Sequence, residues 1–196
     1  MEAMKNYLET VGGILKNLPL PRIEQIMELI YKTYMNDRFI FLFGNGGSAA
    51  TASHLACDFG KGTVSPGQKR MKVMSLTDNL PLITAWANDT QYEDIFAEQL
   101  AHFVSSGDLV IGISGSGKSK NVLNAIKLAK ECGALTVGLT GFDGGEMKDI
   151  VDYCLIVPSN NMQQIEDCHL IITHLIFSLR ETGLQKIGYI PVNKGS

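Results

Sequence analysis

Continuous apolar runs alternate with amphipathic segments along most of the chain. The runs predicted to be strands cover residues 38–43, 72–76, 108–113, 135–139 and 153–157. Their apolar residues are consecutive and do not alternate with polar ones, which is typical of parallel strands buried on both faces. Helical segments separate these runs. We therefore predict an α/β protein, a three-layer α/β/α sandwich around a parallel sheet of about five strands.

Two further helices are predicted before the first strand, at residues 4–16 and 23–34, with a proline-containing break between them. The second shows the three- and four-residue apolar spacing of a one-sided helix. We expect this pair, residues 1–36, to contact the core or a neighbouring subunit. The whole chain, residues 1–196, is predicted to be one domain, with a core at 37–182 and a tail at 183–196. The later helices are expected at 80–87, 92–103, 119–132 and 163–182.

Composition excludes several classes of function. A net charge of −3 without clustered basic residues argues against direct nucleic-acid binding. No apolar run reaches the roughly 18 residues that span a bilayer, and the acidic N-terminus does not resemble a signal peptide. No CxxC spacing links the four cysteines, which predicts buried, reduced thiols in a cytoplasmic protein: Cys57, Cys132, Cys154 and Cys168.

The first strand stops at a glycine-rich turn, Gly44–Ser48, and a segment of small helix-forming residues follows. A strand, a glycine turn and a helix in this order place the helix's free N–H groups at the turn, where they bind anions or hydroxyls. His54 and Asp58 lie four residues apart in this helix, so they project from the same face. The segment therefore offers a binding turn and a candidate pair for metal or proton transfer.

A dinucleotide fingerprint matches this turn only in part. Gly44, Gly46 and Ala49 fit it, but it also needs an acidic residue about 20 positions later to bind the ribose. That distance falls in the basic loop at residues 68–70, and the first acid after the second strand is Asp78. We therefore disfavour nicotinamide binding.

The segment Gly112–Ser119 matches the phosphate-binding pattern of nucleotide hydrolases literally. Such enzymes also need an acid at the end of another strand to hold magnesium. Asp143 comes several residues after its strand and Asp152 precedes one, so a nucleotide-dependent enzyme is the weaker alternative. The serine hydroxyls and N–H groups at the start of a helix still predict a phosphate site.

The last predicted helix carries a second set of candidate ligands. Glu166 and His174 are eight residues apart, so they lean toward one side of the helix. Together with His54 and Asp58 they offer imidazoles and carboxylates, which suit zinc or a similar divalent ion. His102 and His169 have no second matching signal, and we expect them to be packed or surface residues of their helices.

These segments together resemble the sugar isomerase (SIS) domain family, in its phosphoheptose isomerase branch. The resemblance is carried by GNGGSAATASHLACD, ISGSGKSKNV, TGFDGGEM and QQIEDCHLIITH, and it extends over most of the chain. It implies isomerisation of sedoheptulose 7-phosphate to a glycero-manno-heptose 7-phosphate. It also implies a cytoplasmic homotetramer with one zinc ion in each active site, at the junctions between subunits.

Carried over by position, the resemblance assigns a role to each candidate residue. Asp58 and His174 would be the acid/base pair. The metal ligands would be His54, Asp58, Glu166 and His174. The substrate would contact Asn45, Gly46, Gly47, Ser48, Asn88, Asp89, Ser114, Gly115, Ser116, Ser119 and Glu166.

The sequence also departs from the family's usual pattern. The family usually has Glu at Asp58, Gln at Glu166, Asp at Gln163 and Thr at Gly115. Some relatives keep the fold and the glycine turn but act without catalysis, as adaptors of the bacterial replication initiator. A non-catalytic adaptor or sugar-phosphate sensor is therefore the alternative function, and Asp58 and His174 favour the enzyme.

Overall fold

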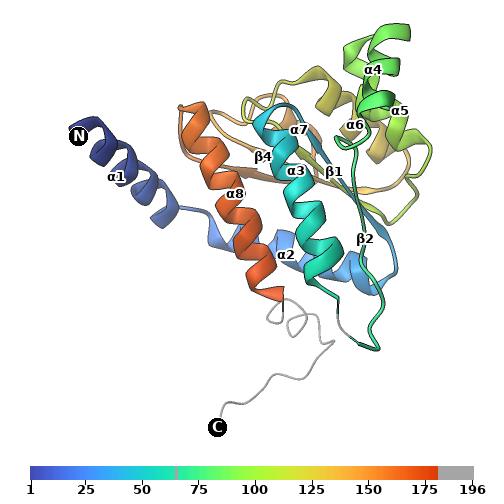
Figure 1. The fold of residues 1–196 in the computed structure, drawn as a ribbon, viewed down its shortest axis with the longest axis horizontal. Helices are drawn as coiled ribbons and strands as arrows, with labels where there is room; N and C mark the ends of the chain where they lie inside the picture. Colours follow the sequence, from blue (N-terminus) through green and yellow to red (C-terminus); the bar gives the residue numbers. More distant parts are fainter. Residues whose placement is uncertain (65, 181–196) are drawn as a thin grey trace.

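The computed structural model describes residues 1–64 and 66–180 and is built around a sheet of five parallel strands (Figure 1). The strand order is β2-β1-β3-β4-β5, and every neighbouring pair is parallel. The prediction of a parallel five-stranded sheet is confirmed. The strands are β1 (Phe39–Gly44), β2 (Lys72–Ser75), β3 (Leu109–Ile113), β4 (Leu135–Thr140) and β5 (Tyr153–Ile156).

Helices connect and cover these strands. A 3₁₀ turn, Tyr92–Asp94, precedes α5, and a π-helical turn, Asp58–Gly62, continues α3. The α-helices are α1 (Glu2–Lys16), α2 (Leu20–Met35), α3 (Gly47–Cys57), α4 (Leu80–Asp89), α5 (Ile95–Ala101), α6 (Lys120–Glu131), α7 (Met147–Ile150) and α8 (Met162–Ser178).

Two apolar cores lie on opposite faces of the sheet. Because consecutive strand residues point to opposite faces, Ile40 and Leu42 of β1 pack against α2, α3 and α8. Phe41 and Phe43 pack on the other face with residues of α5, α6 and α7. β1 is therefore buried on both sides, as its uninterrupted apolar run predicts, and the three layers are confirmed.

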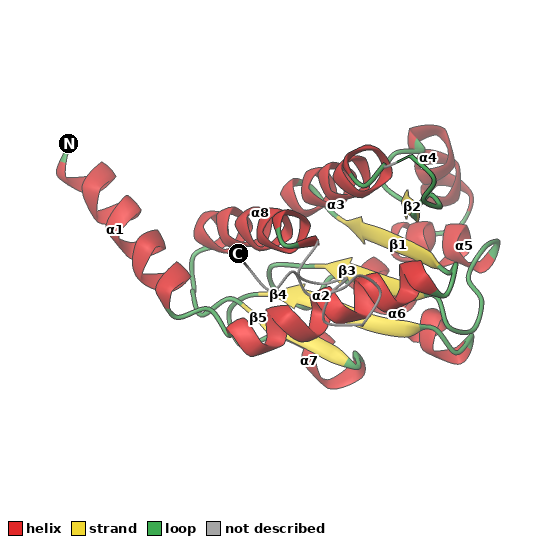
Figure 2. Cartoon of the chain, turned by 90° about the horizontal axis from the view of Figure 1, so that it is seen from below, coloured by secondary structure: helices red, strands yellow, loops and turns green. Residues whose placement is uncertain are grey.

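The N-terminal helices differ from each other. Seven residues of α2 are buried, and this helix packs against the sheet and α8. In α1 only Ile14 is buried, while Met4 and Leu8 are exposed, and the helix extends away from the sheet (Figures 1 and 2). The Tyr7 hydroxyl donates to an Asp167 carboxylate oxygen of α8 at 2.6 Å. Thus most of α2 belongs to the core, whereas α1 leaves the apolar side chains of Met4 and Leu8 exposed.

Several predicted boundaries are shifted. The helix predicted at 92–103 is a 3₁₀ turn followed by the shorter α5, and the helix predicted to run to residue 182 is described as far as Ser178. Residues 181–182 and the predicted tail at 183–196 lie outside the described residues. All four cysteines are free, but only Cys168 is fully buried and Cys57 is exposed, so the expected burial was wrong for Cys57. Within residues 1–64 and 66–180, no helix has the length and apolarity needed to cross a bilayer.

Candidate active site

The glycine turn and the serine turn meet at the carboxyl edge of the sheet. They follow β1 and β3, which are neighbours in the sheet although they are not consecutive strands in sequence. Ligands of open α/β sheets bind where the connections diverge in this way. Each amide of Asn45 and Asn121 donates to the oxygen of the other, at 2.9 and 2.8 Å, and the Tyr92 hydroxyl donates to Asn45 Oδ1 at 2.9 Å. This network holds the two turns together.

The serine turn directs hydroxyl groups toward one region. The Ser114 and Ser119 hydroxyls lie 3.1 Å apart, and Ser114 is buried. Ser116 Oγ accepts a hydrogen bond from the Lys118 N–H at 3.2 Å. Gly117 adopts a φ of +65°, in the left-handed region that favours glycine. Hydroxyls and N–H groups gathered at the start of α6 are the groups that bind phosphate oxygens.

Helix α8 connects the serine turn with α3. Two of its residues lie against glycines of the two turns: a Cβ atom at Gly115 would lie 2.4 Å from Met162 Sδ, and one at Gly47 would lie 2.6 Å from the Glu166 carboxylate. Further along, His174 faces His54 of α3. The two helices run side by side (Figure 1). The N-terminal half of α8 therefore covers both turns, and its C-terminal half faces the middle of α3.

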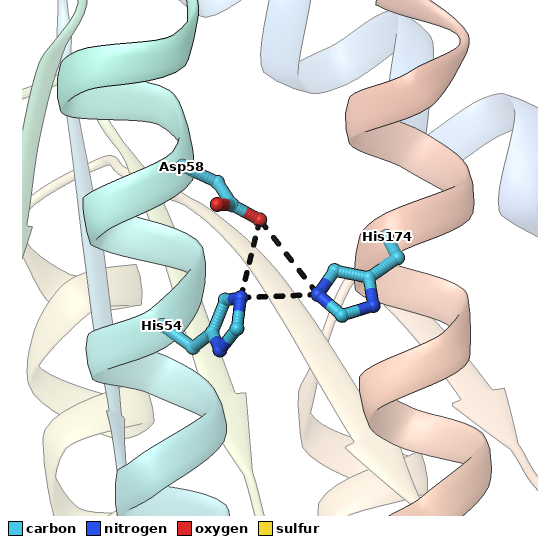
Figure 3. A group of neighbouring side chains, drawn as sticks. All are labelled: His54, Asp58 and His174. Carbon is cyan, nitrogen blue, oxygen red and sulfur yellow. Dashed lines mark hydrogen bonds and ion pairs between the residues drawn. The ribbon is translucent and has the colours of Figure 1, made fainter.

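His54, Asp58 and His174 form a cluster between these helices (Figure 3). The two histidine Nε2 atoms are 3.0 Å apart. Asp58 Oδ2 lies 3.6 Å from His54 Nε2 and 3.9 Å from His174 Nε2. The side chains are partly open to solvent: 47% of His54, 45% of His174 and 22% of Asp58 are exposed.

This cluster fits a divalent metal ion. One ligand atom from each residue lies within 4.8 Å of the others. Two imidazole nitrogens and one carboxylate oxygen are one of the donor sets that hold zinc in catalytic sites with three protein ligands. Asp58 also begins the π-helical turn, and such turns frequently occur at functional sites. The three residues were predicted as ligands, and the structure brings them together.

Glu166, the fourth predicted ligand, does not join this group in the described part of the chain. Its carboxylate lies over Gly47, at the first residue of α3. His54 follows Gly47 by seven positions, which corresponds to roughly 10 Å along a helix. Glu166 therefore lies with the glycine turn, and His54 is about two helical turns away.

The remaining predicted contacts lie in the glycine turn, in α3 and at the end of α4. Gly46 has a φ of +56° in the glycine turn, and Ser48 is buried in the first turn of α3. Asn88 and Asp89 lie at the exposed end of α4, where the Asn88 amide donates to Asp89 Oδ1 at 2.8 Å. Asp152, considered as a magnesium ligand, accepts hydrogen bonds from the N–H and hydroxyl of Thr136, at the start of β4. That position is at the opposite end of the strand from the serine turn.

The other two histidines have no place in the cluster. His169 is buried in α8, and its Nε2 lies 3.1 Å from the Thr140 carbonyl oxygen. Burial lowers the pKa of His169 to about 4, so the ring is neutral at physiological pH. The neutral ring therefore donates from Nε2, and it ties α8 to the end of β4. His102 follows α5 and is exposed.

Sequence reasoning did not single out Asn121 or Tyr92, which hold Asn45 in place. Asn121 lies inside the quoted motif ISGSGKSKNV and is 97% buried. The signal that could have identified Asn121 was its amide side chain, which the sequence places in the first turn of a helix next to a predicted binding turn. Tyr92 reaches Asn45 only through the fold, since 47 residues separate them.

Comparison with known families identifies the class of this domain. The family model for the SIS domain matches residues 6–141. This match covers more than half of the chain and includes the glycine turn, α3 and the serine turn. The chain belongs to the SIS domain family.

Similar curated proteins are phosphoheptose isomerases. The protein from Aliarcobacter butzleri is 38% identical over 178 residues, covering 91% of this chain and 93% of its own length. That from Clostridium acetobutylicum is 37% identical over 182 residues, covering 92% of each chain. The solved phosphoheptose isomerase of Neisseria gonorrhoeae has a TM-score of 0.86 and 28% identity, covering 92% of this chain and 98% of that one. The predicted branch of the family is confirmed.

Proposed function

We propose that this protein is an aldose–ketose isomerase that converts sedoheptulose 7-phosphate to D-glycero-D-manno-heptose 7-phosphate. The observation that carries the proposal is the cluster of His54, Asp58 and His174 on two helices that also border the glycine and serine turns. The similarity to phosphoheptose isomerases over nine-tenths of the chain supports this substrate.

The spacing within the site suits a long sugar phosphate. The serine turn would bind the phosphate, while the cluster, roughly 10 Å along α3 from the glycine turn, would act on the other end. In sedoheptulose 7-phosphate the carbonyl group and the phosphate lie toward opposite ends of the carbon chain. Binding the remote phosphate would hold the reacting carbon next to the acid/base groups and lower the entropic cost of the reaction.

His54, Asp58 and His174 would hold one zinc or similar divalent ion per site. When bound there, the ion supplies a Lewis acid for the carbonyl oxygen of the sugar. Of the two roles predicted for Glu166, its position over Gly47 supports the substrate-binding one. Its carboxylate would accept hydrogen bonds from sugar hydroxyls, together with Asn45, Ser48 and the pair at the end of α4.

Asp58 and His174 would carry out the proton transfers. The Asp58 carboxylate would take a proton from C1 of the ketose, and the electron pair of that C–H bond would form the enediol. The same proton would return to C2, which gives the aldose. His174 would move the hydroxyl proton from O1 to O2. Each general acid or base contributes roughly 10²–10⁴-fold in such steps.

We further propose that the protein is a cytoplasmic homotetramer whose sites are completed by a neighbouring subunit. The half-exposed histidines of the cluster leave room for groups from another chain. The exposed Met4 and Leu8 of α1 offer an apolar surface for that contact.

The direct test is incubation of the purified protein with sedoheptulose 7-phosphate, with and without added zinc. Formation of a new aldose phosphate supports the isomerase. Sugar-phosphate binding without turnover in either condition would instead favour the non-catalytic adaptor or sensor.

A further inference from the structure

A pocket adjoins the serine turn, and the proton transfers proposed above do not involve it. Its lining residues are Ser116, Lys118, Phe142, Asp143 and Asn160. Ser116 also belongs to the predicted phosphate site, so the pocket continues that site outward. Lys118 is the lysine of the nucleotide-hydrolase-like segment, and the proposed function leaves it without a role.

The two walls of the pocket are fixed to each other by backbone contacts. The Gly141 N–H donates to the Gly115 carbonyl at 2.8 Å, and the Met147 N–H donates to the Gly117 carbonyl at 3.0 Å. A Cβ atom at Gly117 would lie 2.0 Å from the Gly144 carbonyl oxygen, so the loops touch with no side chain between them. The loop that carries Asp143 is therefore joined directly to the serine turn by backbone hydrogen bonds.

The conformation of the opposite wall is unusual. Phe142 has a φ of +49°, which is rare for a bulky residue, and its N–H donates to the Ser159 carbonyl at 3.0 Å. Asp143 Oδ1 accepts a hydrogen bond from the Gly145 N–H at 3.1 Å. These bonds orient the Asp143 carboxylate at the edge of the pocket.

The pocket contains one cation and one anion. Among the described residues, the Lys118 ammonium group has no hydrogen-bond or ion-pair partner within bonding distance. Its positive charge nevertheless acts on Asp143. The pKa of Asp143 is lowered first by the hydrogen bond from the Gly145 N–H and second by the charge of Lys118. Lys118 is thus an exposed cation beside a carboxylate that remains negatively charged.

The serine turn by itself offers only neutral hydroxyl and N–H groups. Hydrogen bonds from a charged donor to phosphate are roughly twice as strong as neutral ones. A cation one residue away from Ser119 and two from Ser116 would add such a bond, and Asp143 would oppose an anion in the same place.

We propose that this pocket is the outer part of the phosphate site, where Lys118 binds the dianionic phosphate group of a phosphate monoester and Asp143 weakens that binding. The inference rests on the proposed function for the identity of the sugar, and it deepens that function by assigning its phosphate specificity. Two residues of opposite charge set the affinity in opposite directions. Neutral sugars and sugar carboxylates would therefore bind this end of the site poorly.

Inorganic phosphate is the probe that tests the charges without catalysis. Its dissociation constant is measured by calorimetry on the full chain and on Lys118→Gln, Asp143→Asn and Lys120→Gln. We expect binding to weaken about tenfold in Lys118→Gln, the effect of losing a charged hydrogen bond, and to tighten in Asp143→Asn. Lys120 is the next lysine, exposed at the start of α6 and outside the pocket lining, so Lys120→Gln should leave the constant unchanged.

An unchanged dissociation constant in Lys118→Gln overturns the proposal, and so does weaker binding in Asp143→Asn. A purely structural role would shift both variants in the same direction. Turnover of sedoheptulose 7-phosphate is measured in parallel. Turnover in the wild type with no charge dependence of phosphate binding contradicts only this inference. The expected charge dependence without turnover contradicts only the isomerase.

Discussion

Asp58 has the central chemical role at the scale of single residues. It lies within 4 Å of both histidines of the cluster and belongs to the π-helical turn after α3. Asp58→Asn removes the proposed base while keeping the size of the side chain. We expect turnover to fall by about 10²–10⁴-fold, because an amide cannot take the proton from carbon. Steady-state kinetics with sedoheptulose 7-phosphate measures this effect.

Glu131→Gln is the matched control, since Glu131 is exposed at the end of α6 and far from the cluster in the sequence. It should leave turnover unchanged. Phosphate binding should persist in Asp58→Asn because the serine turn is intact. Wild-type turnover in Asp58→Asn would show that another group acts as the base.

The pKa of His169 predicts a pH dependence of stability. Burial lowers this pKa from 6.5 to about 4 in the folded state. Between these values the unfolded chain binds a proton that the folded chain does not, so stability falls as the pH falls from about 6.5 toward 4. The full effect is about 3 kcal/mol. Urea unfolding across this pH range measures it.

His169→Gln is the informative variant, because an amide can donate to the Thr140 carbonyl and does not titrate. We expect a smaller loss of unfolding free energy between pH 6.5 and 4 than in the wild type. The same pH dependence in both proteins would mean that His169 does not contribute to it.

At the scale of elements, the serine turn depends on its contact with the loop after β4. Gly117→Ala would place a methyl group against the Gly144 carbonyl, at a φ that L residues avoid. The left-handed conformation alone costs about 1–2 kcal/mol. We expect a lower free energy of unfolding and weaker phosphate binding, measured by urea unfolding and calorimetry.

Gly12→Ala is the control, because a Cβ atom at this glycine meets no other atom. Gly12 lies within α1, and no atom lies within 4 Å of a Cβ atom built there. Alanine is favoured over glycine inside a helix by up to about 1 kcal/mol, so this variant should be as stable as the wild type or more so. A stable Gly117→Ala with normal phosphate binding would contradict the proposed role of the loop contact.

The elements themselves were largely predictable from the sequence. The run Phe39–Phe43 has no polar position, and its short length and the glycine turn after it favour a strand covered on both faces. The strand order was not predictable, because the pairing of β1 with both β2 and β3 depends on long-range packing. The break between the 3₁₀ turn at Tyr92 and α5 was not predicted, because the helical periodicity of the sequence continues across it.

The site was predictable where residues share a helix. His54 and Asp58 are one turn apart, so their common face follows from helical geometry. The meeting of His54 with His174 across 120 residues came from the family resemblance, and the structure supports it. The position of Glu166 over Gly47 was not foreseen, because it depends on how far α8 is shifted along α3.

At the scale of the whole molecule, the cluster links metal binding to stability. An ion that binds only the folded chain stabilises it by about 2.7 kcal/mol at a concentration 100 times the dissociation constant. We expect a chelator to lower the melting temperature and turnover, and zinc to restore both. His174→Asn should lose this response. His102→Asn changes an exposed histidine outside the cluster, so this control variant should keep the response to chelator and zinc. A wild-type protein whose melting temperature and turnover do not change with the chelator would contradict the metal site.

The exposed face of α1 predicts an assembly. Light scattering after gel filtration should give the mass of four copies of the full chain. Replacing Met4 and Leu8 together by glutamate places charges on the exposed apolar surface, and we expect a smaller mass with the folded core retained. An unchanged tetramer would place the interface elsewhere.

The central claim is that helices α3 and α8 together form an isomerase site beside a phosphate-binding turn. NMR of the purified, zinc-loaded protein incubated with sedoheptulose 7-phosphate in D₂O tests this claim most directly. The account predicts a new aldose 7-phosphate and, in Asp58→Asn, its formation at a rate about 10²–10⁴-fold lower. A folded, zinc-loaded protein that binds the sugar phosphate but leaves it unchanged would contradict the account.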